Sequence, residues 1–198
     1  MASLTKMMTC FVAIGLAQEL KLDLEGTWFR VSRRAFNTGG TTANLVENQR
    51  LTIYDLLFGL MLPSGNDAAV TLAENFHQQI YQRMKPNSRH NELQRAYAQY
   101  GQSSYCLFVK EMNQTATKLR LTQTKYTNPH GLSDKANHST AFDQALLSTQ
   151  VIKVPLIRLI VSCKTHRTSC YYPLKRILKQ FKDIRPPPPS FEGHELPF

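Results

Sequence analysis

A pair of helices joined by a short turn is the sequence feature that most constrains how this chain folds. Thr52-Ile-Tyr-Asp55 has the spacing of a capping box, in which threonine and acidic side chains satisfy the first backbone amides of a helix. The apolar run that follows predicts a helix through Leu62, which Pro63 ends. Ser64-Gly65-Asn66 then predicts a tight turn before a second helix.

The rest of the chain predicts further helices and little sheet. Asp67 is placed to cap the helix after the turn, and Trp28, Phe29 and Val31 predict one short strand. Residues 79–103 are polar and predict an irregular segment that contains one helix. Helical spacing of apolar residues predicts helices over Ser3 to Lys21, Ala68 to Gln78, Glu92 to Tyr100, Tyr105 to Leu119, Thr140 to Lys153 and Pro155 to Val161.

Composition is that of one folded domain with a basic end. The chain has 198 residues, of which 42% are hydrophobic, and this is enough for a core. No apolar run reaches the length of a membrane span, and no signal peptide is recognisable before Ser3. The net charge is +10, and residues 151–198 hold nine of the 24 Lys and Arg residues. Since no nucleic-acid-binding motif accompanies them, we interpret this end as solvated and expect no nucleic-acid partner.

The four cysteines do not have the spacing of a zinc site, and no metal is expected. Cys10 and Cys106 lie on apolar helix faces and are interpreted as small core residues. Cys163 and Cys170 are near enough in sequence to pair, and the sequence leaves that pairing open.

Ser3 and Lys6 have the spacing of a nucleophile and its base. Residues three apart on a helix lie on one face, so the hydroxyl and the amine point the same way. A serine hydroxyl needs a base in hydrogen-bond reach, and lysine serves as that base only where burial or a nearby positive charge disfavours its ammonium form. Taken alone, the pair is more typical of a capping serine beside an exposed lysine.

Ser64 and Asn66 add a second hydroxyl and an amide from the turn between the two helices. The hydroxyl can relay a proton to a leaving group, and the amide can hold a substrate carbonyl or orient Lys6. Gly65 keeps the turn tight and free of a side chain. The combination of both motifs predicts a serine acyltransferase.

With these residues together, the sequence resembles the D-alanyl-D-alanine carboxypeptidases, the low-molecular-mass penicillin-binding proteins of the S11 peptidase family. The resemblance runs from about residue 1 to about residue 160, and its longest stretch is highly specific. The matching stretches are Ala2–Thr9, Leu51–Ala69, Phe108–Asn113, Thr127–Leu132 and Ser139–Asp143.

The resemblance implies an α+β fold of the β-lactamase/DD-peptidase type, here mainly its helical half with an incomplete antiparallel sheet. It implies Ser3 as the acylated nucleophile, Lys6 as its base, Ser64 as the proton relay and Asn66 as a substrate-binding amide. The implied reaction is attack on the peptide bond between two D-alanines, release of the terminal one and hydrolysis of the acyl-enzyme. His130 is interpreted as a residue that structures its loop rather than a catalytic one.

The resemblance further implies that the enzyme needs no metal or organic cofactor. Its substrate is expected to be a peptide ending in D-Ala-D-Ala, with β-lactams as analogues, and its compartment is expected to be extracytoplasmic.

One family motif, Lys-Thr-Gly on a sheet-edge strand, does not occur in this sequence. Lys164-Thr165-His166 is the nearest string, and we interpret it as a coincidence because its flanks are not typical of a core strand. We therefore expect a chain truncated at both ends: a partial catalytic domain over residues 1–162 and a basic, proline-rich, poorly ordered tail over 163–198.

Two alternatives remain open at this point. The first is a catalytically inactive fragment or binding remnant of the same family, which the missing Lys-Thr-Gly favours. The second is a class A β-lactamase relative, which is disfavoured because no Glu-x-x-Leu-Asn follows Ser64-Gly65-Asn66.

Overall fold

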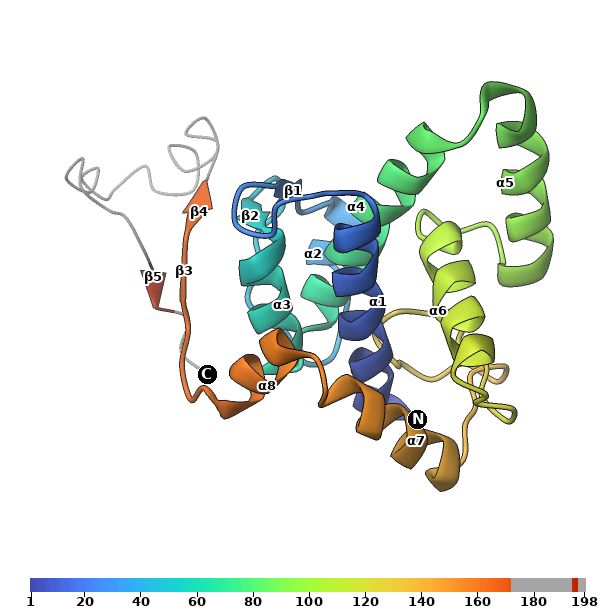
Figure 1. Ribbon diagram of the computed structural model, residues 1–198. Helices are drawn as coiled ribbons and strands as arrows, with labels where there is room; N and C mark the ends of the chain where they lie inside the picture. The colour runs from blue at the N-terminus through green and yellow to red at the C-terminus, as the bar shows by residue number, and fades with distance from the viewer. Residues whose placement is uncertain (172–193, 196–198) are drawn as a thin grey trace.

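The computed structural model describes residues 1–171 and 194–195 as a helical body with a small sheet at one end (Figure 1). A 3-10 turn, η1 (Ala2–Leu4), opens the chain. The helices are α1 (Thr5–Glu19), α2 (Arg33–Phe36), α3 (Ile53–Met61), α4 (Asn66–Arg83), α5 (Pro86–Tyr100), α6 (Cys106–Lys118), α7 (Ala141–Val151) and α8 (Pro155–Ser162).

The main sheet has three short antiparallel strands in the order β1-β2-β4. Strand β1 (Trp28–Arg30) pairs with β2 (Arg50–Thr52), which places Phe29 opposite Leu51. Strand β4 (Cys170–Tyr171) pairs with the other edge of β2. A separate pair joins β3 (Arg167–Thr168) to β5 (His194–Glu195). The described chain is thus mainly helical with a small antiparallel sheet, which confirms the expected fold class.

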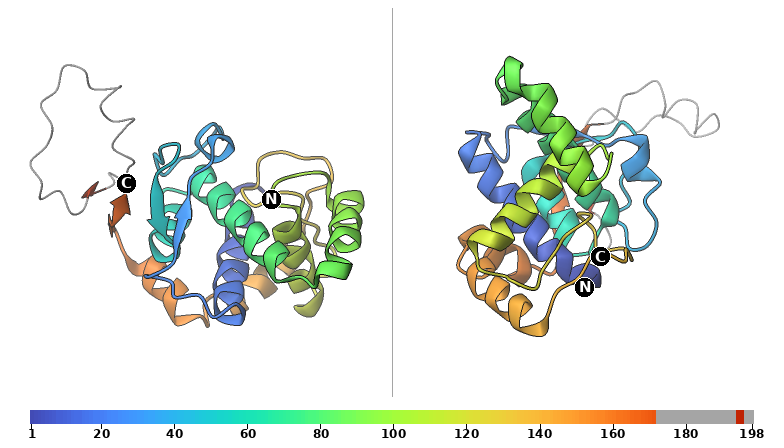
Figure 2. Two further views of the ribbon diagram at one scale, coloured as in Figure 1. Left: turned by 90° about the horizontal axis from the view of Figure 1, so that it is seen from above. Right: turned by 90° about the vertical axis from the view of Figure 1, so that its right-hand side faces the viewer.

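Helix α1 is the centre of the body. It packs against α3, α4, α6 and α7, and Met8, Cys10 and Ala13 have no exposed surface. A helix with a wide apolar surface is stabilised by packing against several neighbours, and Figure 2 shows α1 from two further sides. Ser3 lies just before α1, in η1, and is exposed.

Two of the sequence signals at helix starts, the capping boxes, were accurate. Thr52 Oγ1 accepts a hydrogen bond from the Asp55 amide at 3.0 Å, and Thr140 Oγ1 accepts one from the Asp143 amide at 3.1 Å. In both capping boxes the hydrogen bond from the backbone amide to the threonine side chain is confirmed. Cys10 and Cys106 are fully buried, as expected of core residues.

Two expectations about helices were wrong. Helix α4 begins at Asn66, and Gly65 occupies its N-cap position, so Asp67 is not the cap; its carboxylate is taken by backbone amides of a distant loop. The segment 79–103 is not irregular, since α4 runs to Arg83 and α5 begins at Pro86. Proline is well suited to the first position of a helix, where its missing N–H is no loss.

The described residues after α8 lie against the start of α3. His166 Nε2 contacts Asp55 Oδ1 at 2.7 Å, Thr168 is buried, and β4 extends the main sheet. The domain boundary expected after residue 162 stays a prediction, although residues 163–171 contact the body. The expected proline-rich stretch, Pro186–Pro189, lies outside the described residues.

Two smaller findings bear on earlier expectations. Cys163 has a free thiol. No single helix among the described residues is long and apolar enough to cross a membrane; α7 and α8 together pass by length and composition but are bent by 102°.

Candidate active site

The structure brings the two serines predicted from the sequence into direct contact. Ser3 lies in η1 at the start of α1, and Ser64 lies in the turn between α3 and α4. Ser64 Oγ donates a hydrogen bond to Ser3 Oγ at 2.9 Å, across 61 residues of sequence. Ser3 is exposed and Ser64 half-buried, so the pair is open to a ligand from outside.

Lys6 is buried directly behind Ser3. Its side chain is 3% exposed, and Nζ donates to Ser3 Oγ at 3.4 Å and to the His130 carbonyl at 2.8 Å. Burial lowers the pKa of Lys6 from 10.5 to about 8, against the opposing attraction of the Asp67 carboxylate. A lysine with this pKa can act as a base near neutral pH.

The loop 127–132 supplies the carbonyl that holds Lys6. Asn128 structures the loop, because its Oδ1 accepts from the Gly131 amide at 2.7 Å and its Nδ2 donates to the Leu132 carbonyl at 3.1 Å. Thr9 Oγ1 donates to the Pro129 carbonyl at 2.7 Å, which fixes the loop on α1. These contacts aim the His130 carbonyl at the amine.

Gly131 is required where this loop passes the first turn. Its φ is +85°, and an added Cβ would lie 1.9 Å from the Ala2 carbonyl oxygen. No other residue fits such an approach. The site therefore depends on a close backbone contact between two segments that are far apart in sequence.

The His130 side chain serves its own loop. Its Nδ1 accepts from the Leu132 amide at 3.1 Å. Burial and the nearby Lys6 charge lower the His130 pKa to about 4, so the ring is neutral at physiological pH. This agrees with its interpretation as a loop-structuring residue.

The turn that carries Ser64 has a strained backbone and no spare room. Ser64 has a φ of +58°, which is uncommon for a residue with a side chain. A Cβ on Gly65 would lie 2.6 Å from the Gly59 carbonyl oxygen and 2.9 Å from Ala43 Cβ. The Thr41 hydroxyl donates to the Ser64 carbonyl at 2.6 Å. The strain is thus held in place by the neighbouring loop.

Asn66 makes a different contact from the one expected. Its Nδ2 donates to the Gly39 carbonyl at 2.7 Å, and it is 3% exposed. Its Oδ1 is buried and has no hydrogen-bond partner among the described residues. The amide therefore ties the 39–40 loop to α4, and its substrate-binding role stays a prediction.

Asp67 organises the loop that faces the turn. Its carboxylate accepts hydrogen bonds from the amides of Ala43 at 2.9 Å and Leu45 at 3.0 Å, and from the Thr42 hydroxyl at 2.7 Å. The sequence indicated only a helix cap here. The donors come from residues more than 20 positions away, so no local pattern could reveal them.

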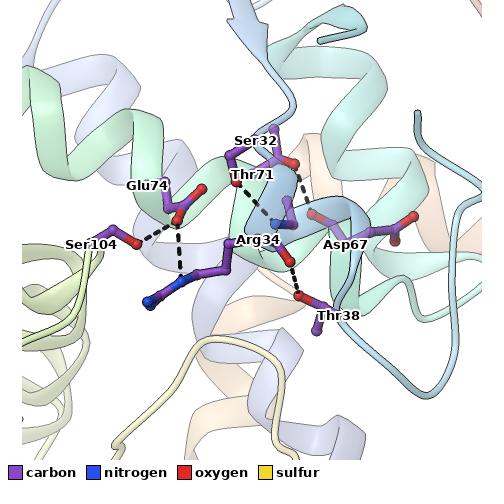
Figure 3. A network of polar contacts seen from close by, with 8 residues as sticks. Ser32, Arg34, Thr38, Asp67, Thr71, Glu74 and Ser104 are labelled. Carbon is purple, nitrogen blue, oxygen red and sulfur yellow. Dashed lines mark hydrogen bonds and ion pairs between the residues drawn. The ribbon is translucent and has the colours of Figure 1, made fainter. Parts of the chain in front are cut away.

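A second polar cluster supports α4 farther along its length (Figure 3). The Thr71 hydroxyl donates to the Asp67 carbonyl at 2.8 Å. One turn on, Glu74 accepts from the Ser104 hydroxyl and lies 4.0 Å from Arg34 Nε. Helix α2 and the loop before α6 are thereby joined to the helix that begins at Asn66.

A pocket of about 450 Å³ opens in front of the two serines. Lys6 and Ser64 form part of its wall, and the remainder is mostly apolar. The lining residues are Met1, Ala2, Ser3, Leu4, Lys6, Met7, Leu60, Met61 and Ser64. A volume of this size is typical of small-ligand sites. The hydroxyls of Ser3 and Ser64 and the Lys6 side chain thus line one open hollow.

Lys164-Thr165-His166 lies away from this pocket. His166 contacts Asp55 in the first turn of α3, whereas Ser64 follows the last turn. A helix of nine residues is about 13 Å long. The placement of His166 agrees with the interpretation of this string as a coincidence.

The described residues include no group of three or more His, Cys, Asp or Glu side chains that could hold a metal ion.

A family model for peptidase S11, described as D-alanyl-D-alanine carboxypeptidase, matches residues 1–85 and 87–176. The chain is 28% identical over 152 residues to the D-alanyl-D-alanine carboxypeptidase DacF of Bacillus subtilis, covering 77% of this chain and 32% of the relative. It is 32% identical over 157 residues to DacD of Escherichia coli, covering 76% and 34%. The chain therefore spans about a third of the length of these relatives.

A comparison with solved structures also finds DD-peptidases. The DD-transpeptidase of Streptomyces superposes with a TM-score of 0.65 at 26% identity, covering 85% of this chain and 57% of that one. DacD of Francisella tularensis superposes with a TM-score of 0.67 at 25% identity, covering 90% and 38%. These matches confirm the expected DD-peptidase-like fold. The chain belongs to the S11 peptidase family, the family of the D-alanyl-D-alanine carboxypeptidases.

Proposed function

We propose that the chain is a serine-type D-Ala-D-Ala carboxypeptidase in which Ser3 is acylated. The observation that carries this proposal is the pair of hydrogen bonds that Ser3 Oγ accepts, from Ser64 Oγ at 2.9 Å and from Lys6 Nζ at 3.4 Å. Family membership supports the reaction type, and the pocket in front of Ser3 supplies space for the acyl group.

Lys6 acts as the base for acylation. At pH 7 roughly a tenth of an amine with a pKa of about 8 is neutral, compared with well under a thousandth for an ordinary lysine. The neutral amine takes the Ser3 proton, and Oγ attacks the carbonyl carbon between the two D-alanines. The carbonyl electron pair moves to oxygen and forms a tetrahedral intermediate.

Ser64 completes the transfer. When the intermediate collapses, the carbon–nitrogen bond breaks and the leaving D-alanine nitrogen needs a proton. The Ser64 hydroxyl supplies it and recovers a proton from the Lys6 ammonium. Water then hydrolyses the Ser3 ester, with neutral Lys6 again as the base, and the second product leaves with a new carboxylate.

The proposed substrate is a peptide that ends in D-Ala-D-Ala, and β-lactams are its analogues. Asn66 is proposed to hold the substrate carbonyl after its side-chain Nδ2 leaves the Gly39 carbonyl. The Asn66 Oδ1 has no hydrogen-bond partner among the described residues, so this movement breaks no hydrogen bond at that atom. The proposed compartment is extracytoplasmic, as the resemblance implies. No cofactor takes part in the proposed steps.

Release of D-alanine tests the proposal. The purified chain is incubated with an N-acylated tripeptide ending in D-Ala-D-Ala, and free D-alanine is measured with a D-amino-acid oxidase. We expect release by the wild-type chain and none by Ser3→Ala. Ser162→Ala is the matched control, because Ser162 is exposed and its hydroxyl donates only within α8.

The same peptide ending in D-Ala-L-Ala controls for general peptidase activity and is expected to stay intact. Equal D-alanine release by the wild type and Ser3→Ala would exclude Ser3 as the nucleophile. A wild-type chain that neither releases D-alanine nor forms an adduct with a β-lactam would favour the inactive remnant.

A further inference from the structure

An apolar groove lies next to the pocket in front of Ser3. The groove has a volume of about 420 Å³, and Met7 and Met61 line both hollows. Its other lining residues belong to α7, α8 and the segment between them, which cross the ends of α1 and α3 in Figure 1. They are Ser148, Thr149, Val151, Ile152, Ile157 and Val161.

Each of the two methionines is close in sequence to one of the two serines. Met7 lies in the first turn of α1, four residues after Ser3 in η1. Met61 is the last residue of α3 and precedes Ser64 by three. The Ser148 hydroxyl lies 3.8 Å from Met7 Sδ. The two methionines therefore form a wall that the pocket in front of Ser3 and the groove share.

The groove is uncharged and offers little hydrogen bonding. Its two hydroxyls donate within their own helix, Ser148 to the Gln144 carbonyl at 2.8 Å and Thr149 to the Leu146 carbonyl at 2.7 Å. Ile152 is 49% exposed and Val161 is 51% exposed. An apolar group that covers them gains free energy, whereas a charged group placed there would lose its hydration without a partner.

We propose that this groove is an apolar subsite for the acyl half of the substrate, reached from Ser3 over Met7 and Met61. The subsite selects acyl donors that carry an uncharged, apolar arm on the acyl side of the scissile carbonyl. Methionine side chains are flexible, so they can adapt to arms of different shape. This inference rests on the proposed function, because only attack by Ser3 brings such an arm to the groove.

Two penicillins with the same nucleus test the subsite. One carries a benzyl arm, and the other carries the same arm with an added carboxylate. The second-order rate constant of acylation is measured by intact-protein mass spectrometry. The wild type is expected to prefer the uncharged arm by roughly tenfold, even though the chain's charge of +10 attracts the anionic compound.

The double variant Ile152→Gln, Val161→Gln makes the groove polar and is expected to reduce the rate ratio to about 2. Both side chains are about half exposed, so the substitutions disturb little packing; the single variants repeat the test if the double variant melts early. Leu159→Gln is the matched control, because Leu159 is 48% exposed on α8 but does not line the groove. It is expected to keep the wild-type ratio.

A wild-type ratio near 1 would overturn the subsite and leave the proposed function intact. An unchanged ratio in the double variant would also overturn it, because the preference would then arise elsewhere. A wild-type chain acylated by neither penicillin would overturn the proposed function, and the subsite with it.

Discussion

The two ends of α3 each hold a cluster of polar side chains, and only one of them has the properties of a reactive site. At its start, the Asp55 carboxylate accepts hydrogen bonds from the Thr52 hydroxyl at 2.9 Å and the Ser169 amide at 3.2 Å, and it contacts His166 Nε2 at 2.7 Å. Beyond its last residue, Ser64 contacts Ser3 in front of a pocket.

The two clusters differ in how many of their polar atoms have hydrogen-bond partners within the protein. Asp55 is 4% exposed and both of its carboxylate oxygens are bonded. The ring of His166 is stacked on Phe58, with centroids 3.7 Å apart. At the other end Ser3 is exposed, and burial holds the pKa of Lys6 at about 8. A satisfied cluster stabilises the fold, whereas a desolvated base beside an accessible hydroxyl can do chemistry.

Removing the base should give the largest effect. Lys6→Met keeps the length of the side chain and removes the amine, so acylation by penicillin is expected to fall by about 10³-fold. The rate is measured by intact-protein mass spectrometry over time. Lys118→Met, at an exposed lysine, is the control. A Lys6→Met chain that acylates at the wild-type rate would remove Lys6 from the mechanism.

Loss of the relay should cost less than loss of the base. Ser64→Ala removes the hydrogen bond to Ser3 Oγ, and acylation is expected to slow by about 10²-fold. Ser162→Ala should leave the rate unchanged. If Ser64→Ala acylates at the rate of this control, the contact between the two serines has only a structural role, like the cluster around Asp55 at the start of α3.

The pH dependence of acylation should follow Lys6. Because the neutral amine is the reactive form, the rate is expected to fall about tenfold for each pH unit below about 8 and to level off above it. Rate constants between pH 5.5 and 9.5 check this. A rate that is flat from pH 6 to 8 would mean that Lys6 is not the titrating base.

The loop contact at Gly131 should affect acylation. Gly131→Ala places a methyl group against the Ala2 carbonyl and is expected to slow acylation about tenfold by moving the His130 carbonyl away from Lys6. Gly101→Ala is a matched control, because Gly101 has a φ of +82° with nothing within 4 Å. Equal rates in the two variants would limit the role of Gly131 to backbone strain.

The cluster at the start of α3 should affect stability alone. Asp55→Ala leaves the Ser169 amide and His166 without their acceptor and removes a helix-capping contact, at a cost of about 2 kcal/mol in unfolding free energy. Urea unfolding measures the loss. Acylation of the folded variant at 25 °C is expected to match the wild type, and a large fall would mean that the two ends are coupled.

Local patterns in the sequence were sufficient for most of the long helices and for half of the site. Thr52 and Thr140 cap helices within three residues, and Ser3 and Lys6 are one turn apart, so short-range spacing determines both. The approach of Ser64 to Ser3 spans 61 residues and was predicted through the family resemblance.

The missed contacts are those made by loops. Asp67 was assigned as a cap because its partners at residues 42–45 are not its sequence neighbours. Asn66 turns to the Gly39 carbonyl and the His130 carbonyl holds Lys6, and each contact depends on a loop placed by tertiary packing. A carbonyl leaves no side-chain signature, so the sequence could not indicate its role.

The most direct measurement is the site of covalent attachment after treatment of the chain with a penicillin. Intact mass gives the number of adducts, and peptide mapping locates them. We expect one penicilloyl group, on Ser3, and none in Ser3→Ala. An adduct on Ser64 or Ser162, or an adduct that persists in Ser3→Ala, would contradict the assignment of Ser3 as the nucleophile.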